Sequence, residues 1–158
     1  MTIFLINILL AFLWASFQQF RPLDVVTGFA LGYGIIWLTQ AWLGSSATRY
    51  IQRVPTFLRF TGYYLAELVT STWQVIRALF LPQSSLRPGI VAFPLEARTD
   101  LEIVLLNNLL VMTPGTLGVD LSPDRHTLYI HFLDIPDPDA ARLRITQGLE
   151  RRLLEVLR

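Results

Sequence analysis

The sequence predicts a membrane α-helical N-terminal half, with two to three helices, followed by a small α+β domain of β-α-β-β-α order. The first observation is composition: the chain is 53% hydrophobic and only 16% charged, with a mean hydropathy of +0.46, unlike most soluble domains. The second is charge placement, because 1–81 hold five Arg and two acids whereas 82–158 hold eight Arg and ten acids. We therefore expect 1–81 to face lipid and the rest to face water.

Two apolar segments open the chain and predict a helical hairpin. The first, expected to be helical over 2–20, is short for a bilayer crossing unless its flanks contribute. The second, 24–43, is long enough to cross, and Trp37 and Trp42 near its end suit the headgroup region. The very short connection between the two segments requires the helices to run antiparallel.

Two glycines of the second segment lie on one helix face. Gly28 and Gly32 are four residues apart, a spacing that leaves a strip of bare backbone against which another helix can pack closely. Glycine is also generally frequent in membrane helices, so the spacing alone fits either a packing face or ordinary enrichment.

A third helix is expected over 56–81, and it carries a polar stripe at helical spacing. The helix either crosses the membrane with this stripe against other helices, or lies along the membrane interface. The stripe consists of Glu67, Thr70, Ser71, Gln74 and Arg77.

Basic residues between the second and third helices bear on the topology. Arg49, Arg53 and Arg59 mark this region as cytoplasmic, because cytoplasmic loops are enriched in basic residues. Three crossings would then place the C-terminal domain outside the cell, whereas an interfacial third helix, or a first hairpin that does not fully cross, would leave it in the cytoplasm. Both arrangements stay open from the sequence.

Glu67 is the one acid within an apolar helix, which makes it a candidate functional residue. It could belong to a proton or Na⁺ relay, or form a polar contact that locks helices together. A single acid does not make a relay, so the contact is the favoured interpretation.

A proline-rich linker is expected over 82–88, followed by the domain over 89–158. Its first strand is predicted from Gly89 to Leu95, with Pro94 favouring a strand end or a sheet edge. Thr99 and Glu102 form a capping-box pattern that starts a helix over 100–112. This helix is apolar on most sides, which predicts a covering partner or membrane.

A hairpin and a final helix complete the predicted domain. Strands are expected over 116–121 and 127–133, joined by a type I turn, and a helix over 139–157. Pairing of Leu121 with His126 would give the hairpin one continuous apolar face. That face would hold Leu117, Val119, Leu121, Leu128, Ile130 and Phe132.

Residues that could carry chemistry are sparse. The chain has no Cys, and His126 and His131 are five apart in a predicted strand, so they point to opposite faces and do not share a metal. There is no phosphate-binding loop and no nucleophile with a nearby base. We expect no enzymatic activity, no metal and no cofactor. Arg and acids are interspersed, which argues against nucleic-acid binding.

A motif around the hairpin resembles the signature of the E subunit of the multisubunit Na⁺/H⁺ antiporters, the Mrp or Mnh family. It runs from Met112 to Asp120 and continues through 127–131 to Asp134. Pro114 and Gly115 would end the preceding helix and turn the chain, so a structural role suffices for them. The motif residues singled out are Thr113, Pro114, Gly115, Thr116, Asp120, Tyr129 and His131.

The resemblance implies an accessory or assembly subunit of a hetero-oligomeric antiporter that exchanges Na⁺ for protons. Such a subunit would lie in the plasma or inner membrane as a multi-pass protein, with its small domain in the cytoplasm. Its partners would be other antiporter subunits and membrane lipid, while larger subunits move the ions. The alternative is an independent membrane-anchored module whose hairpin face binds a protein or ligand.

Overall fold

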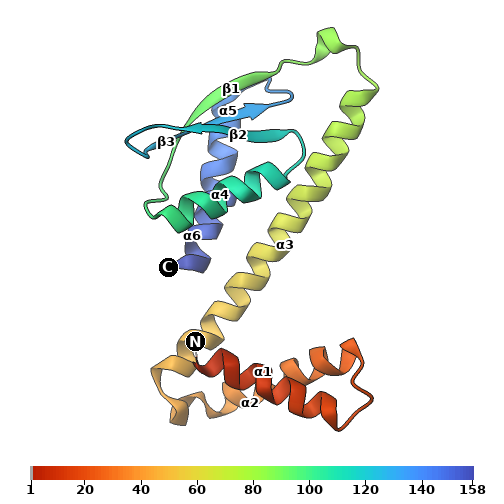
Figure 1. The fold of residues 1–158 in the computed structure, drawn as a ribbon, viewed down its shortest axis with the longest axis vertical. Helices are drawn as coiled ribbons and strands as arrows, with labels where there is room; N and C mark the ends of the chain where they lie inside the picture. Colours follow the sequence, from red (N-terminus) through yellow and green to blue (C-terminus); the bar gives the residue numbers. More distant parts are fainter. Residues whose placement is uncertain (1) are drawn as a thin grey trace. The chain divides into compact units, whose positions relative to one another are not determined.

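The computed structural model describes residues 2–158, and the chain divides into two compact units. The first extends to Phe57 and the second comprises Leu58–Arg158. Helix α3, Ser45–Leu79, begins in the first unit and ends in the second (Figure 1). Each unit is therefore described in its own right.

The first unit is a helical hairpin followed by the start of α3. Helix α1, Thr2–Ser16, packs along α2, Pro22–Leu43, and Pro22 lies in the first turn of α2, where its missing N–H costs nothing (Figure 1). Asp24 accepts the Arg21 backbone N–H at 2.9 Å and so closes the start of α2. Helix α2 is long and apolar enough to cross a membrane, whereas α1 is a shorter apolar helix.

The third helix begins earlier than the sequence predicted, so a start at residue 56 is wrong. Residues Ser45 onward are helical, and they include Arg49 and Arg53. Pro55 lies inside the helix, where it removes one backbone N–H but does not end it. A buried contact holds this early part, because Asn7 donates to the Tyr50 hydroxyl at 2.6 Å.

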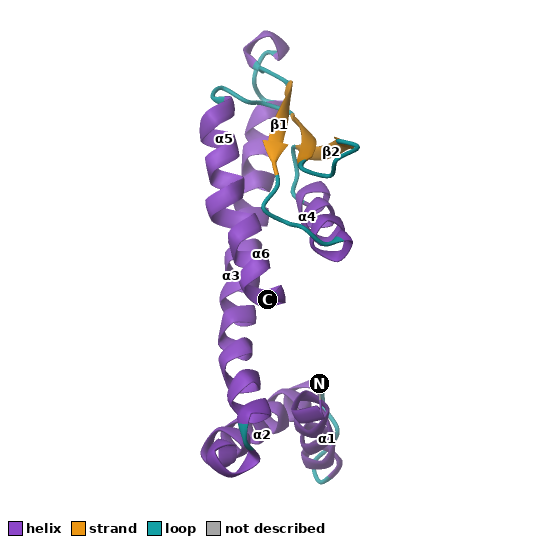
Figure 2. Cartoon of the chain, turned by 90° about the vertical axis from the view of Figure 1, so that its left-hand side faces the viewer, coloured by secondary structure: helices purple, strands orange, loops and turns teal. Residues whose placement is uncertain are grey.

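The second unit contains a three-stranded antiparallel sheet with helices packed on one face (Figures 1 and 2). Its order is β1-β3-β2, so the middle strand is the last in sequence. The strands are β1 (Gly89–Pro94), β2 (Thr116–Leu121) and β3 (Thr127–Phe132). The helices are α4 (Asp100–Met112), α5 (Pro138–Arg144) and α6 (Arg151–Leu157), with a π-helical segment, Ile145–Glu150, joining α5 to α6.

Alternation along the strands separates a core face from an open face. In β1, Val91 and Phe93 are buried while Ile90 is exposed, as expected for a sheet covered on one side. The core also takes in apolar residues of α4 and of the C-terminal helices. The predicted capping box is confirmed, since Thr99 accepts the Glu102 N–H at 3.2 Å and Glu102 accepts that of Thr99.

The predicted hairpin register is wrong. Leu121 pairs with Leu128, not with His126, and Leu117 lies opposite His131. The ladder is irregular between Gly118 and Asp120, so an extra residue in β2 shifts the alternation. Leu117 and Val119 consequently lie exposed, outside the apolar face on which the sequence placed them.

The C-terminal part of α3 belongs to the second unit. Phe60, Tyr63 and Tyr64 pack against the domain core, and the Tyr64 hydroxyl donates to the Leu109 carbonyl at 3.0 Å. The division between compact units therefore falls after Phe57, whereas 82–88 only joins the end of α3 to β1. The expected boundary between membrane and water near 82–88 stays a prediction.

Two leucines of α4 provide a matched test of this packing. Leu106 is fully buried and Leu101 is 63% exposed. We expect Leu106→Ala to cost about 2–5 kcal/mol of unfolding free energy, and hydrogen exchange of the β3 amides to accelerate at least ~30-fold. Leu101→Ala is the control and should leave exchange nearly unchanged. Equal exchange rates in the two variants would contradict the assigned core.

Candidate functional site

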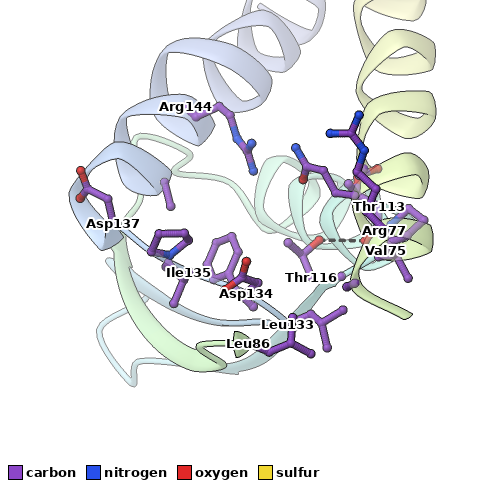
Figure 3. Close-up of a pocket in the computed structure, with 18 of the residues that line it drawn as sticks. Val75, Arg77, Leu86, Thr113, Thr116, Leu133, Asp134, Ile135, Asp137 and Arg144 are labelled. Atoms are coloured by element: carbon purple, nitrogen blue, oxygen red, sulfur yellow. Dashed lines mark hydrogen bonds between the residues drawn. The ribbon is translucent and has the colours of Figure 1, made fainter. Parts of the chain in front are cut away.

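A cavity of about 510 Å³ lies beside the motif in the second unit (Figure 3). Helix α3 forms one side, and the connection from β3 to α5 forms another. Thr113, Pro114, Gly115 and Thr116 line it where α4 turns into β2. The first half of the sequence motif therefore borders this cavity.

Hydrogen bonds within this turn explain its residue types. The Thr113 hydroxyl donates to the Leu109 carbonyl at 2.8 Å, and the Thr116 hydroxyl lies 2.6 Å from the Leu110 carbonyl, so both satisfy the free end of α4. Gly115 has a φ of +88°, a conformation that favours glycine. A side chain there would also press on Val75 of α3. The turn therefore ends α4 and lets α3 pack closely against Gly115.

The polar side chains around the cavity do not form a catalytic arrangement. Asp134 accepts the Arg87 backbone N–H at 3.1 Å, and Asp137 caps α5, so both carboxylates are already engaged. Gln74, Arg77 and Arg144 are the remaining long polar groups that line it (Figure 3). Residues 2–158 contain no cluster of three His or acids able to hold a metal.

Glu67 faces the domain. Its carboxylate lies 3.9 Å from the Arg144 guanidinium of α5, and its side chain is only 22% exposed. Ser71, one turn further along the same stripe, is buried. Glu67 and Ser71 are thus directed toward the α+β domain, whereas Thr70, Gln74 and Arg77 of the same polar stripe are exposed.

The second half of the motif lies on the open face of the sheet. Register places His131 between Ile90 and Leu117 in one row across the strands. In the next row Tyr129 lies between Ala92 and Asp120. The structure therefore separates the motif into a turn group and a sheet-face group. The sheet-face group is bordered by exposed apolar side chains.

Gly28 and Gly32 both meet α1 in the first unit. A Cβ on Gly28 would lie 2.8 Å from the Ala11 carbonyl oxygen, and one on Gly32 would overlap the Asn7 side chain. Gly34 has open space around its Cα. Bare backbone at the two buried glycines is what lets α1 and α2 approach so closely.

Two carboxylates hold four consecutive backbone amides at the start of α4. Glu150 accepts the N–H groups of Glu96 and Ala97 at 2.7 and 3.0 Å. Glu102 accepts those of Arg98 and Thr99 at 2.8 and 3.2 Å. The Arg158 guanidinium binds both oxygens of Glu102, at 3.0 and 3.2 Å. The β1–α4 connection is therefore fixed to α4 and to the C-terminal helix.

The pKa values of these two carboxylates are shifted in opposite directions. The Arg158 hydrogen bond, helped by the two amides, holds the pKa of Glu102 at about 2. Burial raises the pKa of Glu150, whose second carboxylate oxygen has no partner among the described residues. Sequence reasoning found Glu102 through its capping box but missed Glu150, because the π-helical segment that brings it inward has no simple periodic signal.

Comparison with known families identifies the chain's relatives. The profile of the family described as Na⁺/H⁺ ion antiporter subunit, MNHE, matches residues 7–156. The Na⁺/H⁺ antiporter E subunit of Bacillus subtilis is 35% identical over 98% of this chain and 97% of its own length. The chain belongs to this MNHE family of Na⁺/H⁺ antiporter subunits. The E subunit of Alkalihalophilus pseudofirmus is 32% identical over 96% of each chain.

Solved structures agree with this membership, and the family resemblance drawn from the motif is confirmed. A chain of the Mrp complex from Dietzia sp. is 30% identical with a TM-score of 0.51, over 65% of this chain and 96% of that chain. A chain of the archaeal membrane-bound sulfane sulfur reductase is 22% identical with a TM-score of 0.57, over 99% of both chains. The second likeness concerns the fold alone.

The hairpin glycines of this MNHE chain can be tested against a built-in control. We expect Gly32→Ala to destabilise the hairpin by about 1–3 kcal/mol, because the new methyl group overlaps Asn7. Gly34→Ala adds the same atom in open space and should be neutral or slightly stabilising. Thermal unfolding of the detergent-solubilised chain measures both. Indistinguishable melting of the two variants would refute the packing role.

The low pKa of Glu102 predicts a pH dependence. A folded-state pKa lowered from 4.5 to about 2 stabilises the fold while the carboxylate is ionised. The advantage of wild type over Glu102→Gln should be complete at neutral pH and shrink as pH falls from 4.5 toward about 2. Urea midpoints by near-UV circular dichroism report it, with the exposed Glu155→Gln as control. A constant difference at every pH would be inconsistent with this assignment.

Proposed function

We propose that this chain is an accessory subunit that assembles a hetero-oligomeric Na⁺/H⁺ antiporter and does not itself carry the ions. Full-length similarity to proteins named as E subunits of Na⁺/H⁺ antiporters is the observation that carries the proposal. Exposed apolar side chains on the open sheet face support it, because a self-sufficient protein leaves few such surfaces uncovered.

The polar groups of the apolar helices agree with an assembly role. In the hairpin, Asn7 is buried and bound to Tyr50. Glu67 is directed to Arg144 of the α+β domain. Glu67 is the only acid in the sequence between Asp24 and Glu96, and a single acid does not make the series of proton carriers that transfer through a membrane requires. Glu67 then serves to join α3 to the domain.

The membrane topology that we propose has two crossings, α1 and α2, with the α+β domain in the cytoplasm. Helix α1 spans only ~22 Å, so the bilayer must thin locally or the flanks must contribute. Residues 58–79 of α3 pack along a domain that carries many exposed charges, and such a domain does not enter hydrocarbon. Arg49 and Arg53, just after α2, favour the cytoplasmic side.

Deletion and complementation test the proposed function. Without this chain, the remaining subunits should fail to assemble, and Na⁺-driven proton exchange in membrane vesicles should be lost. The full chain should restore both, and Glu67→Gln should restore exchange to near the wild-type rate, since we place Glu67 outside the ion path. Full exchange by the remaining subunits alone would exclude the assembly role. Normal assembly without exchange in Glu67→Gln would instead place Glu67 in the path.

A further inference from the structure

An apolar stripe runs along α3 on the side opposite the domain. Its members lie seven residues apart at the start and three or four apart from Leu65 onward, and they are 40–84% exposed. The residues that pack on the domain, such as Tyr64 and Ser71, lie about half a turn away from them. The stripe consists of Leu58, Leu65, Val69, Trp73, Ile76 and, just past the helix, Phe80.

The charges that accompany the stripe are all positive. Arg59 and Arg77 are eighteen residues apart, which is five helical turns, so they flank the stripe on the same side. The Arg77 guanidinium lies 5.3 Å from the centre of the Trp73 ring. Glu67 is the only acid between Asp24 and Glu96, and it is turned toward Arg144. The outward side of α3 therefore has no acid.

We infer that this stripe lies on the anionic phospholipid surface of the membrane, with the chain from Leu58 to Phe80 parallel to it. An apolar face bordered by Trp and Arg is the pattern of interfacial helices, and anionic headgroups complement Arg59 and Arg77. Only Gly44 separates α3 from the membrane helix α2, so the helix starts at the bilayer. The inference rests on the proposed two-crossing topology and adds a lipid-binding surface to it.

The absence of cysteine in the sequence permits site-directed spin labelling of the full chain. Single variants Leu65→Cys, Val69→Cys and Ile76→Cys are placed alone in nanodiscs of phosphatidylcholine and phosphatidylglycerol. We expect all three labels to favour oxygen over a nickel chelate at one shared, shallow depth. Thr70→Cys, adjacent in sequence but off the stripe, is the matched control and should be open to the chelate.

The other outcomes overturn the inference in distinguishable ways. A depth that changes steadily along the helix would mean that α3 crosses the bilayer. Labels open to water in nanodiscs, but shielded in the whole antiporter complex, would assign the stripe to a neighbouring subunit. In the second case the chain would still co-purify with antiporter subunits, so the proposed function would survive while the lipid contact would not.

A second experiment tests whether anionic headgroups contribute to the binding. Arg59→Gln with Arg77→Gln should lower the ratio of docked to undocked label at Val69→Cys by about fivefold for each Arg. The loss should vanish in nanodiscs of phosphatidylcholine alone, and Arg87→Gln, outside α3, should have little effect. An unchanged ratio in phosphatidylglycerol nanodiscs would remove the role of anionic headgroups.

Discussion

The packing of α3 on the α+β domain determines what the rest of the second unit can do. Aromatic residues such as Tyr64 and the pair of Glu67 with Arg144 hold one side of this helix, including its only acid, against the domain. The apolar side is then left outward, which reverses the arrangement of an ordinary surface helix. An outward apolar stripe needs a non-aqueous neighbour, so this one contact ties the domain to a membrane or a partner.

Local signals in the sequence were sufficient for much of the domain. Thr99 with Glu102 located the start of α4, and Pro114 with Gly115 located its end, because capping and turn chemistry act over a few residues. The family motif was also readable without the fold. The motif did not predict that its residues lie in two separate places. The strand pairing puts Thr116 and His131 on opposite faces of the sheet.

The errors have a common physical origin in single-residue irregularities. An extra residue near Val119 shifts the β2 register, and α3 continues through Pro55, which sequence rules treat as a boundary. The π-helical segment before Arg151 likewise brings Glu150 inward to bind the β1–α4 connection. Each of these three irregularities is locally unfavourable and is stabilised by tertiary contacts. The periodicity of the sequence does not show such contacts.

The open sheet face also has a consequence for the chain before assembly. Ile90, Leu117 and Val119 remain exposed on a sheet whose outer strands are both edges. Chaperones and proteases recognise such surfaces in proteins that lack their partners. A copy made in excess would therefore be removed, and the cellular abundance of this protein would follow the supply of the subunits that cover it.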